Sequence, residues 1–89
     1  MQCVSLTYQL TLSRDAIKFL AKQERSVQER IRKGLLGLAV RPPIGDIQPL
    51  KGRGKQLRLR VGTYRVIFEV DHEEKVVYIL TIDNRGDVY

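Results

Sequence analysis

The clearest pattern of hydrophobic and polar positions in this 89-residue chain runs from Leu57 to Val70. Hydrophobic and polar side chains alternate there, and alternation with a period of two is typical of half-buried strands. Gly62-Thr63 interrupts the alternation, and a two-residue connection that begins with Gly predicts a β-hairpin with a II′ turn. The expected register pairs Val61 with Tyr64, Arg60 with Arg65, Leu59 with Val66 and Arg58 with Ile67.

The two faces of this hairpin differ in their chemistry. One face is largely apolar, with Leu57, Leu59, Val61, Tyr64, Val66, Phe68 and Val70. The other face carries Arg58, Arg60 and Arg65. Like charges that lie opposite each other destabilise a sheet, and a guanidinium group cannot lose its charge to relieve the repulsion. The pattern therefore indicates that an anionic group binds on the arginine side of the hairpin.

Helical and strand patterns flank the hairpin on both sides. A short strand is predicted over residues 8–12, and Ser13 is placed to cap a helix from Arg14 to Lys22. A second helix is expected to begin at Ser26 with the capping box Ser26-Val-Gln-Glu29 and to stop before Pro42-Pro43. Glu29 and Lys33 are spaced to form an ion pair on it. Glycine and proline predict an irregular loop over residues 44–56, and a last strand is expected from Val76 to Ile82.

The predicted order of elements is β-α-α-β-β-β, which indicates a single α+β domain over residues 1–89. Its sheet would be mainly antiparallel. The two helices would form a hairpin whose apolar side covers the apolar face of the sheet. The fold prediction therefore leaves the arginine side of the sheet without a helix over it.

The loop before the last strand decides which residues join the arginines. A three-residue loop at 72–74 would place Val70 opposite Val76 and Arg65 opposite Thr81. Val77 and Ile79 would then share the cationic face with Thr81. The same parity brings Arg85 to this face if the strand stays extended.

The charge of the chain favours an anionic partner. Sixteen Lys and Arg against ten Asp and Glu give a net charge of +6. No acidic residue lies between Asp46 and Glu69, where six basic residues fall. Three of them, Lys51, Arg53 and Lys55, belong to a glycine-rich loop of a kind that contacts phosphate backbones, although it matches no phosphate-loop motif. A solvated basic surface stays open as the alternative.

Several classes of protein are disfavoured. One Cys and one His rule out an internal disulfide and argue against a zinc site. We expect a cytoplasmic protein without a membrane segment or signal peptide. There is no nucleophilic serine elbow, carboxylate pair or nucleotide loop, and no cofactor is expected. An arginine cluster can still bind phosphate and stabilise developing charge, and RNA supplies its own nucleophile, the 2′-OH.

The segments LRLRVGTYRVIFEVD and VVYILTIDNRGDVY, together with the order of elements, resemble the RelE/ParE superfamily of bacterial and archaeal toxins. The resemblance covers almost the whole chain, and its most specific parts are residues 58–65 and 84–89. RelE-like members cleave messenger RNA in the ribosomal A site, without metal, through a 2′,3′-cyclic phosphate. The resemblance implies a ribosome-dependent endoribonuclease that an acidic RelB-like antitoxin neutralises.

The resemblance also implies which residues act. The catalytic set would be Arg58, Arg60, Arg65, Arg85 and Tyr89, with Lys51, Arg53 and Lys55 contacting RNA. The first three arginines would grip the scissile phosphate, and Arg85 would stabilise the phosphate or the leaving 5′-oxygen. Tyr89 would stack on a base or orient the 2′-OH.

The general base stays unassigned at this point. Arg58 and Arg60 occupy positions that are lysine in some RelE toxins, and arginine cannot act as a base at ordinary pH. Glu69, the Tyr89 phenol, the terminal carboxylate and a ribosomal group are the candidates. Two other functions also stay open: a ParE-like poison of DNA gyrase that acts by protein–protein binding, and a catalytically inactive module that binds antitoxin or nucleic acid.

Overall fold

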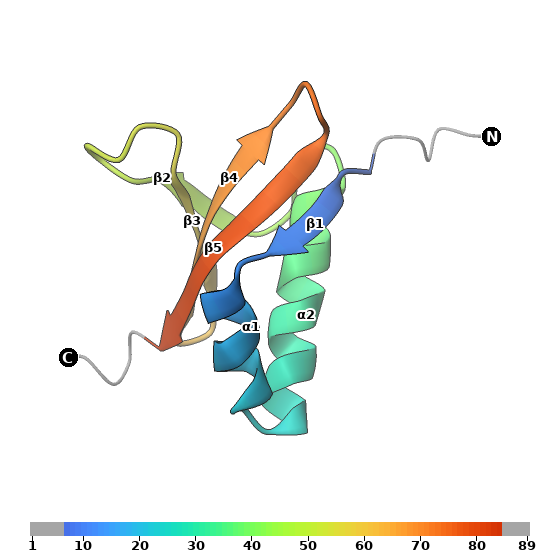
Figure 1. The fold of residues 1–89 in the computed structure, drawn as a ribbon, viewed down its shortest axis with the longest axis vertical. Helices are drawn as coiled ribbons and strands as arrows, with labels where there is room; N and C mark the ends of the chain where they lie inside the picture. Colours follow the sequence, from blue (N-terminus) through green and yellow to red (C-terminus); the bar gives the residue numbers. More distant parts are fainter. Residues whose placement is uncertain (1–6, 85–89) are drawn as a thin grey trace.

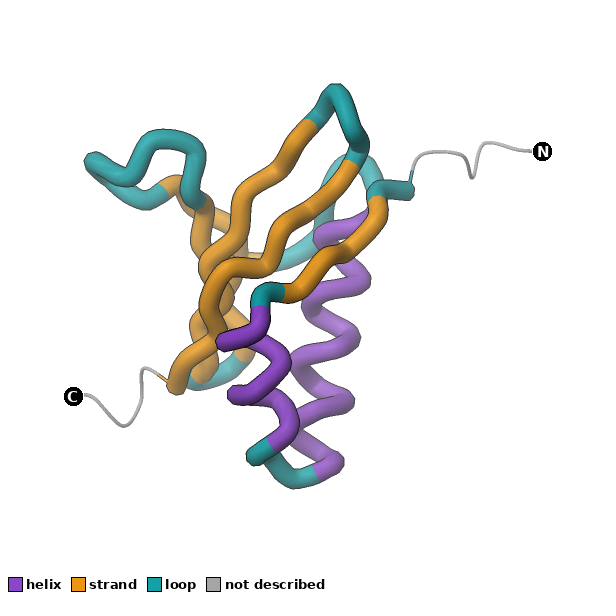
Figure 2. Tube along the Cα trace, viewed as in Figure 1, coloured by secondary structure: helices purple, strands orange, loops and turns teal. Residues whose placement is uncertain are grey.

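Two helices pack against one face of a five-stranded sheet in the computed structural model, which describes residues 7–84 (Figure 1). The elements are β1 (Gln9–Leu12), α1 (Arg14–Ala21), α2 (Arg25–Ala39), β2 (Asp46–Pro49), β3 (Leu57–Val61), β4 (Tyr64–Asp71) and β5 (Val76–Asn84). The strand order is β1-β5-β4-β3-β2, with β1 parallel to β5 and the other neighbours antiparallel. The layers are clear in Figure 2, where both helices lie on the same side of the strands. The predicted α+β fold class is confirmed.

The central hairpin forms in the predicted register. All four predicted pairs, from Val61 with Tyr64 to Arg58 with Ile67, are present between β3 and β4. Gly62 has a φ of 61°, a value that glycine adopts without steric cost at the first central position of such a turn. Leu59 and Val66 are buried on the helix side of the sheet, where they join the core with Ile31 of α2.

The sequence prediction of an irregular loop over residues 44–56 is wrong for β2. This strand pairs with β3, with Asp46 opposite Arg60 and Pro49 opposite Leu57. Glycine and proline flank the paired stretch instead of interrupting it. Proline is tolerated there because β2 is an edge strand, whose outer hydrogen bonds are not needed for the sheet.

The helix starts follow one prediction and contradict another. Ser13 caps α1 as predicted, because its Oγ accepts a hydrogen bond from the Ala16 N–H at 3.1 Å. The capping box at Ser26 is wrong: α2 begins at Arg25, and its N-cap residue, Glu24, makes no side-chain capping bond. Ser26 therefore lies inside the first turn of α2.

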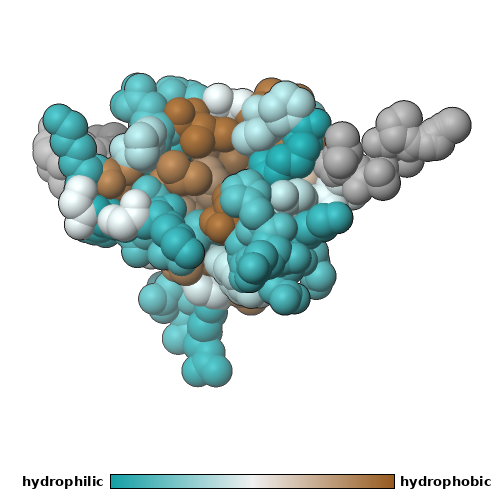
Figure 3. Space-filling view, turned by 90° about the horizontal axis from the view of Figure 1, so that it is seen from above, coloured by the Kyte–Doolittle hydropathy of each residue, from teal (hydrophilic) through white to brown (hydrophobic). Residues whose placement is uncertain are grey.

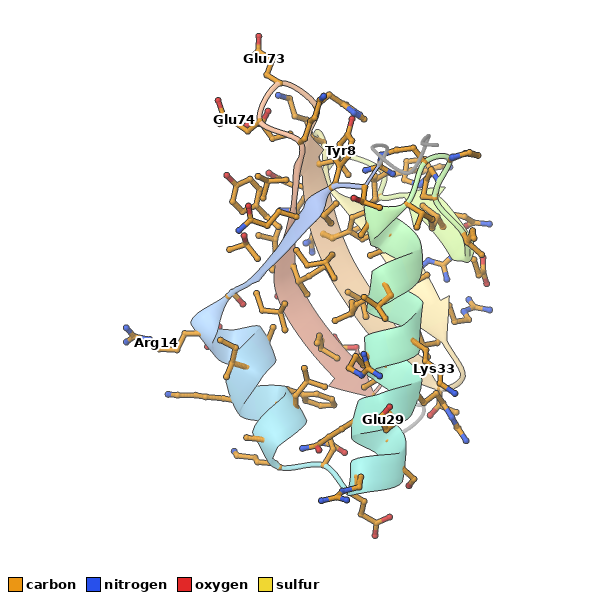
Figure 4. The ribbon with its side chains drawn as sticks, turned by 90° about the vertical axis from the view of Figure 1, so that its right-hand side faces the viewer. Tyr8, Arg14, Glu29, Lys33, Glu73 and Glu74 are labelled. Carbon is orange, nitrogen blue, oxygen red and sulfur yellow. The ribbon has the colours of Figure 1, made fainter. Side chains whose placement is uncertain are left out.

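The predicted ion pair on α2 also differs in the structure. Glu29 pairs with Arg32 at 3.3 Å, three residues along the helix, instead of with Lys33. Glu29 and Lys33 are exposed and project from α2 on the side view in Figure 4. Because such exposed pairs contribute little to stability, this change has no consequence for the fold.

The connection between β4 and β5 is one residue longer than predicted. Asp71 pairs with Val76, so residues 72–75 form the loop. The Asp71 side chain closes it, with Oδ1 accepting hydrogen bonds from the N–H groups of Glu73 and Glu74 at 3.0 Å each. This turn shifts β5 by one residue relative to the predicted register.

A β-bulge in β5 shifts the register by one residue more. The pairing passes from Ile67 with Thr81 directly to Phe68 with Ile79, which leaves Leu80 as the extra residue. Ser13 holds both carbonyls at this point: its N–H donates to Ile79 O at 2.8 Å, and its hydroxyl donates to Leu80 O at 2.7 Å. The residue that caps α1 therefore also fixes the bulge.

The two shifts change which side chains lie on each face of β5. Val77 and Ile79 precede the bulge and are completely buried in the core, so their predicted place on the cationic face is wrong. Thr81 follows the bulge and is exposed, on the predicted face. The residue opposite Arg65 is Asp83 instead of the predicted Thr81.

Candidate functional site

Three arginines lie on the face of the sheet that the helices leave uncovered. Arg58 and Arg60 come from β3 and Arg65 from β4, alternating with core residues that point to the helices. Arg60 and Arg65 are directly opposite each other, as predicted. We call the surface formed by Arg58, Arg60 and Arg65 the arginine face.

Arg65 forms the shortest ion pair on the arginine face. Its Nη2 lies 2.9 Å from Oδ2 of Asp83, and the two side chains are 29% and 36% exposed. The Nε of Arg65 and the Oδ1 of Asp83 are buried without a hydrogen-bond partner. The pair is therefore joined by one hydrogen bond, although both groups have the geometry for two.

Arg58 and Arg60 share a second carboxylate, that of Asp46 on the edge strand β2. The nitrogen–oxygen distances are 3.6 Å to Arg58 and 4.0 Å to Arg60. The side chain of Arg58 is only 11% exposed, whereas that of Arg60 is 63% exposed. Arg60 and Arg65 are therefore more accessible on this face than Arg58 is.

Neither carboxylate was predicted from the sequence as a partner of the arginines. Asp46 was placed in a loop, so its pairing with β3 was not visible. Asp83 lies beyond the end predicted for the last strand, and its facing depends on the loop length and on the bulge. A single acidic residue directly after a long apolar run was the available signal, and it did not specify a face.

The remaining predicted site residues lie apart from the arginine face or outside the described chain. Lys51, Arg53 and Lys55 are exposed in the loop between β2 and β3, which projects from the sheet in Figure 1. Hydrogen bonds in both directions between Arg53 and Gln56 shape this loop, from Arg53 Nη1 to the side-chain oxygen and from the Gln56 N–H to Arg53 O. Arg85 and Tyr89 lie outside the described residues.

A pocket of about 820 Å³ opens at the other end of the sheet, beyond the start of β3. Its apolar wall is formed by Ile47, Leu57, Phe68 and Val70, and its rim includes Arg41, Lys55, Glu69 and His72. Seen from above in Figure 3, hydrophobic side chains gather on this end of the molecule with hydrophilic side chains around them. The rim of the pocket carries both acidic and basic side chains. We therefore expect a phosphate to bind more weakly in the pocket than on the arginine face.

Tyr8, directly before β1, contacts two residues that line this pocket. The Arg41 guanidinium lies over its ring at 3.9 Å, and its hydroxyl is 2.9 Å from His72 Nδ1. Figure 4 shows Tyr8 at the same end of the molecule as Glu73 and Glu74 of the β4–β5 loop. The Nε and Nη2 atoms of Arg41 are buried without a hydrogen-bond partner in the described part of the chain.

Residues 7–84 contain neither a group of three or more His, Cys, Asp and Glu side chains suited to hold a metal ion nor a helix long and apolar enough to cross a membrane. The arginine face presents cations and carboxylates on an open sheet. This arrangement can bind and orient a phosphate and stabilise extra negative charge on it.

The chain belongs to the RelE/ParE superfamily of toxins: residues 10–89 match the family model described as "ParE toxin of type II toxin-antitoxin system, parDE". It is therefore a toxin of a type II toxin–antitoxin system. The predicted family membership is confirmed.

Named relatives are of the RelE type. Toxin RelG of Mycobacterium tuberculosis is 31% identical over 83 residues, covering 82% of this chain and 93% of that protein. Among solved structures, the archaeal RelE–RelB complex from Pyrococcus horikoshii is 29% identical with a TM-score of 0.76, covering 90% of this chain and 97% of that one. The RelBE2 complex of M. tuberculosis is 26% identical with a TM-score of 0.80, covering 93% and 97%.

Proposed function

We propose that this toxin is a ribosome-dependent endoribonuclease that cleaves messenger RNA in the A site. The observation that carries the proposal is the arginine face, an open sheet surface on which Arg60 and Arg65 are partly exposed. A phosphodiester is the anion that such a surface suits, because guanidinium groups bind phosphate through paired hydrogen bonds. The RelE-type names of its relatives support the same function.

The reaction needs little covalent chemistry from the protein. The 2′-oxygen of the RNA attacks the adjacent phosphorus, the bond to the 5′-oxygen breaks, and the products are a 2′,3′-cyclic phosphate and a 5′-OH end. The 2′-OH gives its proton to a base, and the leaving 5′-oxygen receives one. Arg60 and Arg65 would stabilise the extra negative charge on the phosphorane, with Arg58 adding charge from below.

Further roles complete the proposed site. Arg85 would neutralise the phosphate or the leaving oxygen, and Tyr89 would stack on a base or orient the 2′-OH. Lys51, Arg53 and Lys55 would contact the RNA backbone from their exposed loop. Among candidates for the base, Glu69 belongs to the described residues and shares the arginine face by strand parity, two residues beyond Ile67.

The proposed partner in the resting state is an acidic antitoxin. The RelE proteins of P. horikoshii and the RelBE2 toxin of M. tuberculosis were crystallised in complex with their antitoxins. With a net charge of +6, this chain suits a partner of opposite charge. An acidic RelB-like chain would both neutralise the arginines and block their access to RNA.

A ParE-like poison of DNA gyrase is the second candidate, because the matching family model carries the ParE name. Such a toxin would act by binding protein, without cutting RNA. The fold serves both activities, so it does not separate them. The arginine face favours RNA cleavage, because its three arginines outnumber the two carboxylates paired with them and because Arg60 and Arg65 are exposed enough to contact a phosphate.

The two functions predict different damage in expressing cells. RNA cleavage should produce new 5′-OH ends inside coding regions within minutes of induction, while purified gyrase keeps its supercoiling activity in the presence of the toxin. Gyrase poisoning should give the reverse. Mapping of 5′-OH ends beside a supercoiling assay decides between them, and intact messages in growth-arrested cells would overturn the proposed endoribonuclease.

A further inference from the structure

The pairing of Arg65 with Asp83 differs from the other ion pairs of the arginine face. It has the shortest distance, 2.9 Å, against 3.6 and 4.0 Å for the pairs made by Asp46. The two residues are direct cross-strand partners on the central strands β4 and β5. Asp46, in contrast, lies on the edge strand and is 50% exposed. Asp83 is therefore much better placed to fix the orientation of a guanidinium group.

The backbone is arranged so that Asp83 reaches this position. Without the bulge at Leu80, Asp83 would share the face of Val77 and Ile79, which is the core side of the sheet. The bulge is held by Ser13, whose hydroxyl donates to Leu80 O at 2.7 Å. Bulges often redirect a side chain near a functional site. Here the side chain that is redirected is the carboxylate opposite Arg65.

The ion pair with Asp83 does not use every hydrogen-bond donor of the Arg65 guanidinium group. Asp83 accepts one hydrogen bond, from Nη2, and Arg65 Nε is buried without a hydrogen-bond partner among the described residues, while 29% of the Arg65 side chain stays exposed. A guanidinium group that is held at one nitrogen and is still partly exposed can receive a phosphate without losing its orientation. Such fixed donors stabilise developing charge because no reorganisation is needed during the reaction.

We propose that Asp83 is a positioning residue for the arginine face: it holds the Arg65 guanidinium so that the exposed part of this group faces the scissile phosphate. This role rests on the proposed endoribonuclease function. Asp83 does not touch the RNA and takes no proton. It acts through Arg65, at the cost of placing a negative charge near the bound phosphate.

Asp46 provides a matched control on the same face. Asp83→Asn and Asp46→Asn each remove one acidic charge and take the net charge from +6 to +7. Both variants should bind the ribosome–message complex at least as tightly as the wild type, because long-range attraction increases equally. They should differ in the rate of the chemical step, since only Asp83 holds Arg65.

The experiment is single-turnover cleavage of message on programmed ribosomes by the full-length protein, over a range of toxin concentrations. We expect Asp83→Asn to lower the saturated rate about 10–100-fold, a typical effect of a misplaced catalytic group. Asp46→Asn, which removes the longer contacts to Arg58 and Arg60 and none to Arg65, should lower the saturated rate less than Asp83→Asn does and should reach it at a lower toxin concentration. Asp83→Glu, which retains the charge, should recover more of the rate than Asp83→Asn does.

A structural readout accompanies the kinetics. In ¹⁵N NMR spectra of the purified protein, restrained rotation should keep the Nη signals of Arg65 separate in the wild type. These signals, assigned by their loss in Arg65→Lys, should merge in Asp83→Asn and stay separate in Asp46→Asn. Thermal melts of each variant show whether a lower rate comes only from a smaller folded fraction, a result that would overturn the positioning role.

Two other results have distinct meanings. If the wild type does not cleave message, the endoribonuclease function fails, and the role of Asp83 fails with it. If the wild type cleaves but Asp83→Asn has the same saturated rate as Asp46→Asn, only the positioning role is overturned. Unchanged Arg65 signals in Asp83→Asn would overturn it as well.

Discussion

Individual arginines on the arginine face differ in how far each can reach a ligand. Arg60 is largely exposed and only loosely associated with Asp46, whereas Arg58 is almost buried. Arg65 is intermediate, partly exposed and fixed by Asp83. Arg65 therefore combines access with a defined orientation, and it is the residue whose replacement should affect catalysis most.

We predict that Arg65→Ala lowers the single-turnover cleavage rate roughly 10²–10³-fold, the effect of losing one preorganised donor to a transition state. Arg65→Lys should restore little activity, because an ammonium group cannot reproduce the planar donor fork. Leu59→Ala is the control for stability: it removes a side chain that is 1% exposed and should cost about 2–5 kcal/mol in the free energy of unfolding. Full-rate cleavage by a folded Arg65→Ala protein would remove the arginine face from the mechanism.

The sequence was sufficient to place the three arginines together and insufficient to find their counterions. Strand alternation and a two-residue turn determine the facing of Arg58, Arg60 and Arg65, and both are local features. The position of Asp83 depends on a four-residue turn and a bulge, which together displace β5 by two residues. Two shifts of one residue restore the original parity, so Thr81 was assigned to the correct face with the wrong partner.

Among the elements, α2 shows most clearly how packing overrides local sequence preference. Gly37 accepts a hydrogen bond from the Ile44 N–H at 2.9 Å, so the chain after the helix passes directly over it. A Cβ atom at Gly37 would lie 2.6 Å from the Ile44 carbonyl oxygen, and one at Gly34 would lie 2.8 Å from a methyl group of Val61. Glycine is unfavourable within a helix, but at these two positions it leaves room for the Ile44 backbone and the Val61 side chain.

We predict that Gly37→Ala destabilises the protein by about 1–3 kcal/mol, although alanine is the better helix former, because a backbone oxygen has no room to move. The melting temperature should fall by about 4–8 °C for each kcal/mol. Ser26→Ala is the matched control on α2 and should leave stability unchanged or slightly raised, since Ser26 is not the N-cap. A loss of about 1 kcal/mol in Ser26→Ala would instead indicate that its hydroxyl caps the helix.

The elements with a clear hydrophobic periodicity of their own were predicted from the sequence. The strand β2, which depends on its pairing with β3, was not predicted. The apolar stripes of α1 and α2 and the alternation of β3 and β4 lie within their own residues. β2 has four residues and ends at a proline, so only its pairing with β3 makes it a strand. Its omission also concealed Asp46, the carboxylate that Arg58 and Arg60 share.

In the molecule as a whole, helices cover one face of the sheet and leave the other face exposed. The helices cover the core side (Figure 1), and the arginine face stays open. Apolar residues also line the pocket at the end of the sheet. A small basic protein with these surfaces gains stability from any acidic chain that covers them, because binding to the folded state alone shifts the unfolding equilibrium.

We predict that a small acidic antitoxin is encoded next to this toxin and that the two proteins are isolated as a tight complex when they are co-expressed. At a free antitoxin concentration of about 100 times Kd, binding adds about 2.7 kcal/mol to the stability of the toxin. Its melting temperature should then rise on the order of 10–20 °C. Arg65→Ala should still be recovered with the partner, since many other contacts remain, and this separates antitoxin binding from catalysis. Affinity purification through a tag on one chain tests whether the complex forms, and thermal melts with and without the second chain measure the stabilisation. Recovery of the toxin alone at every expression level would contradict the prediction.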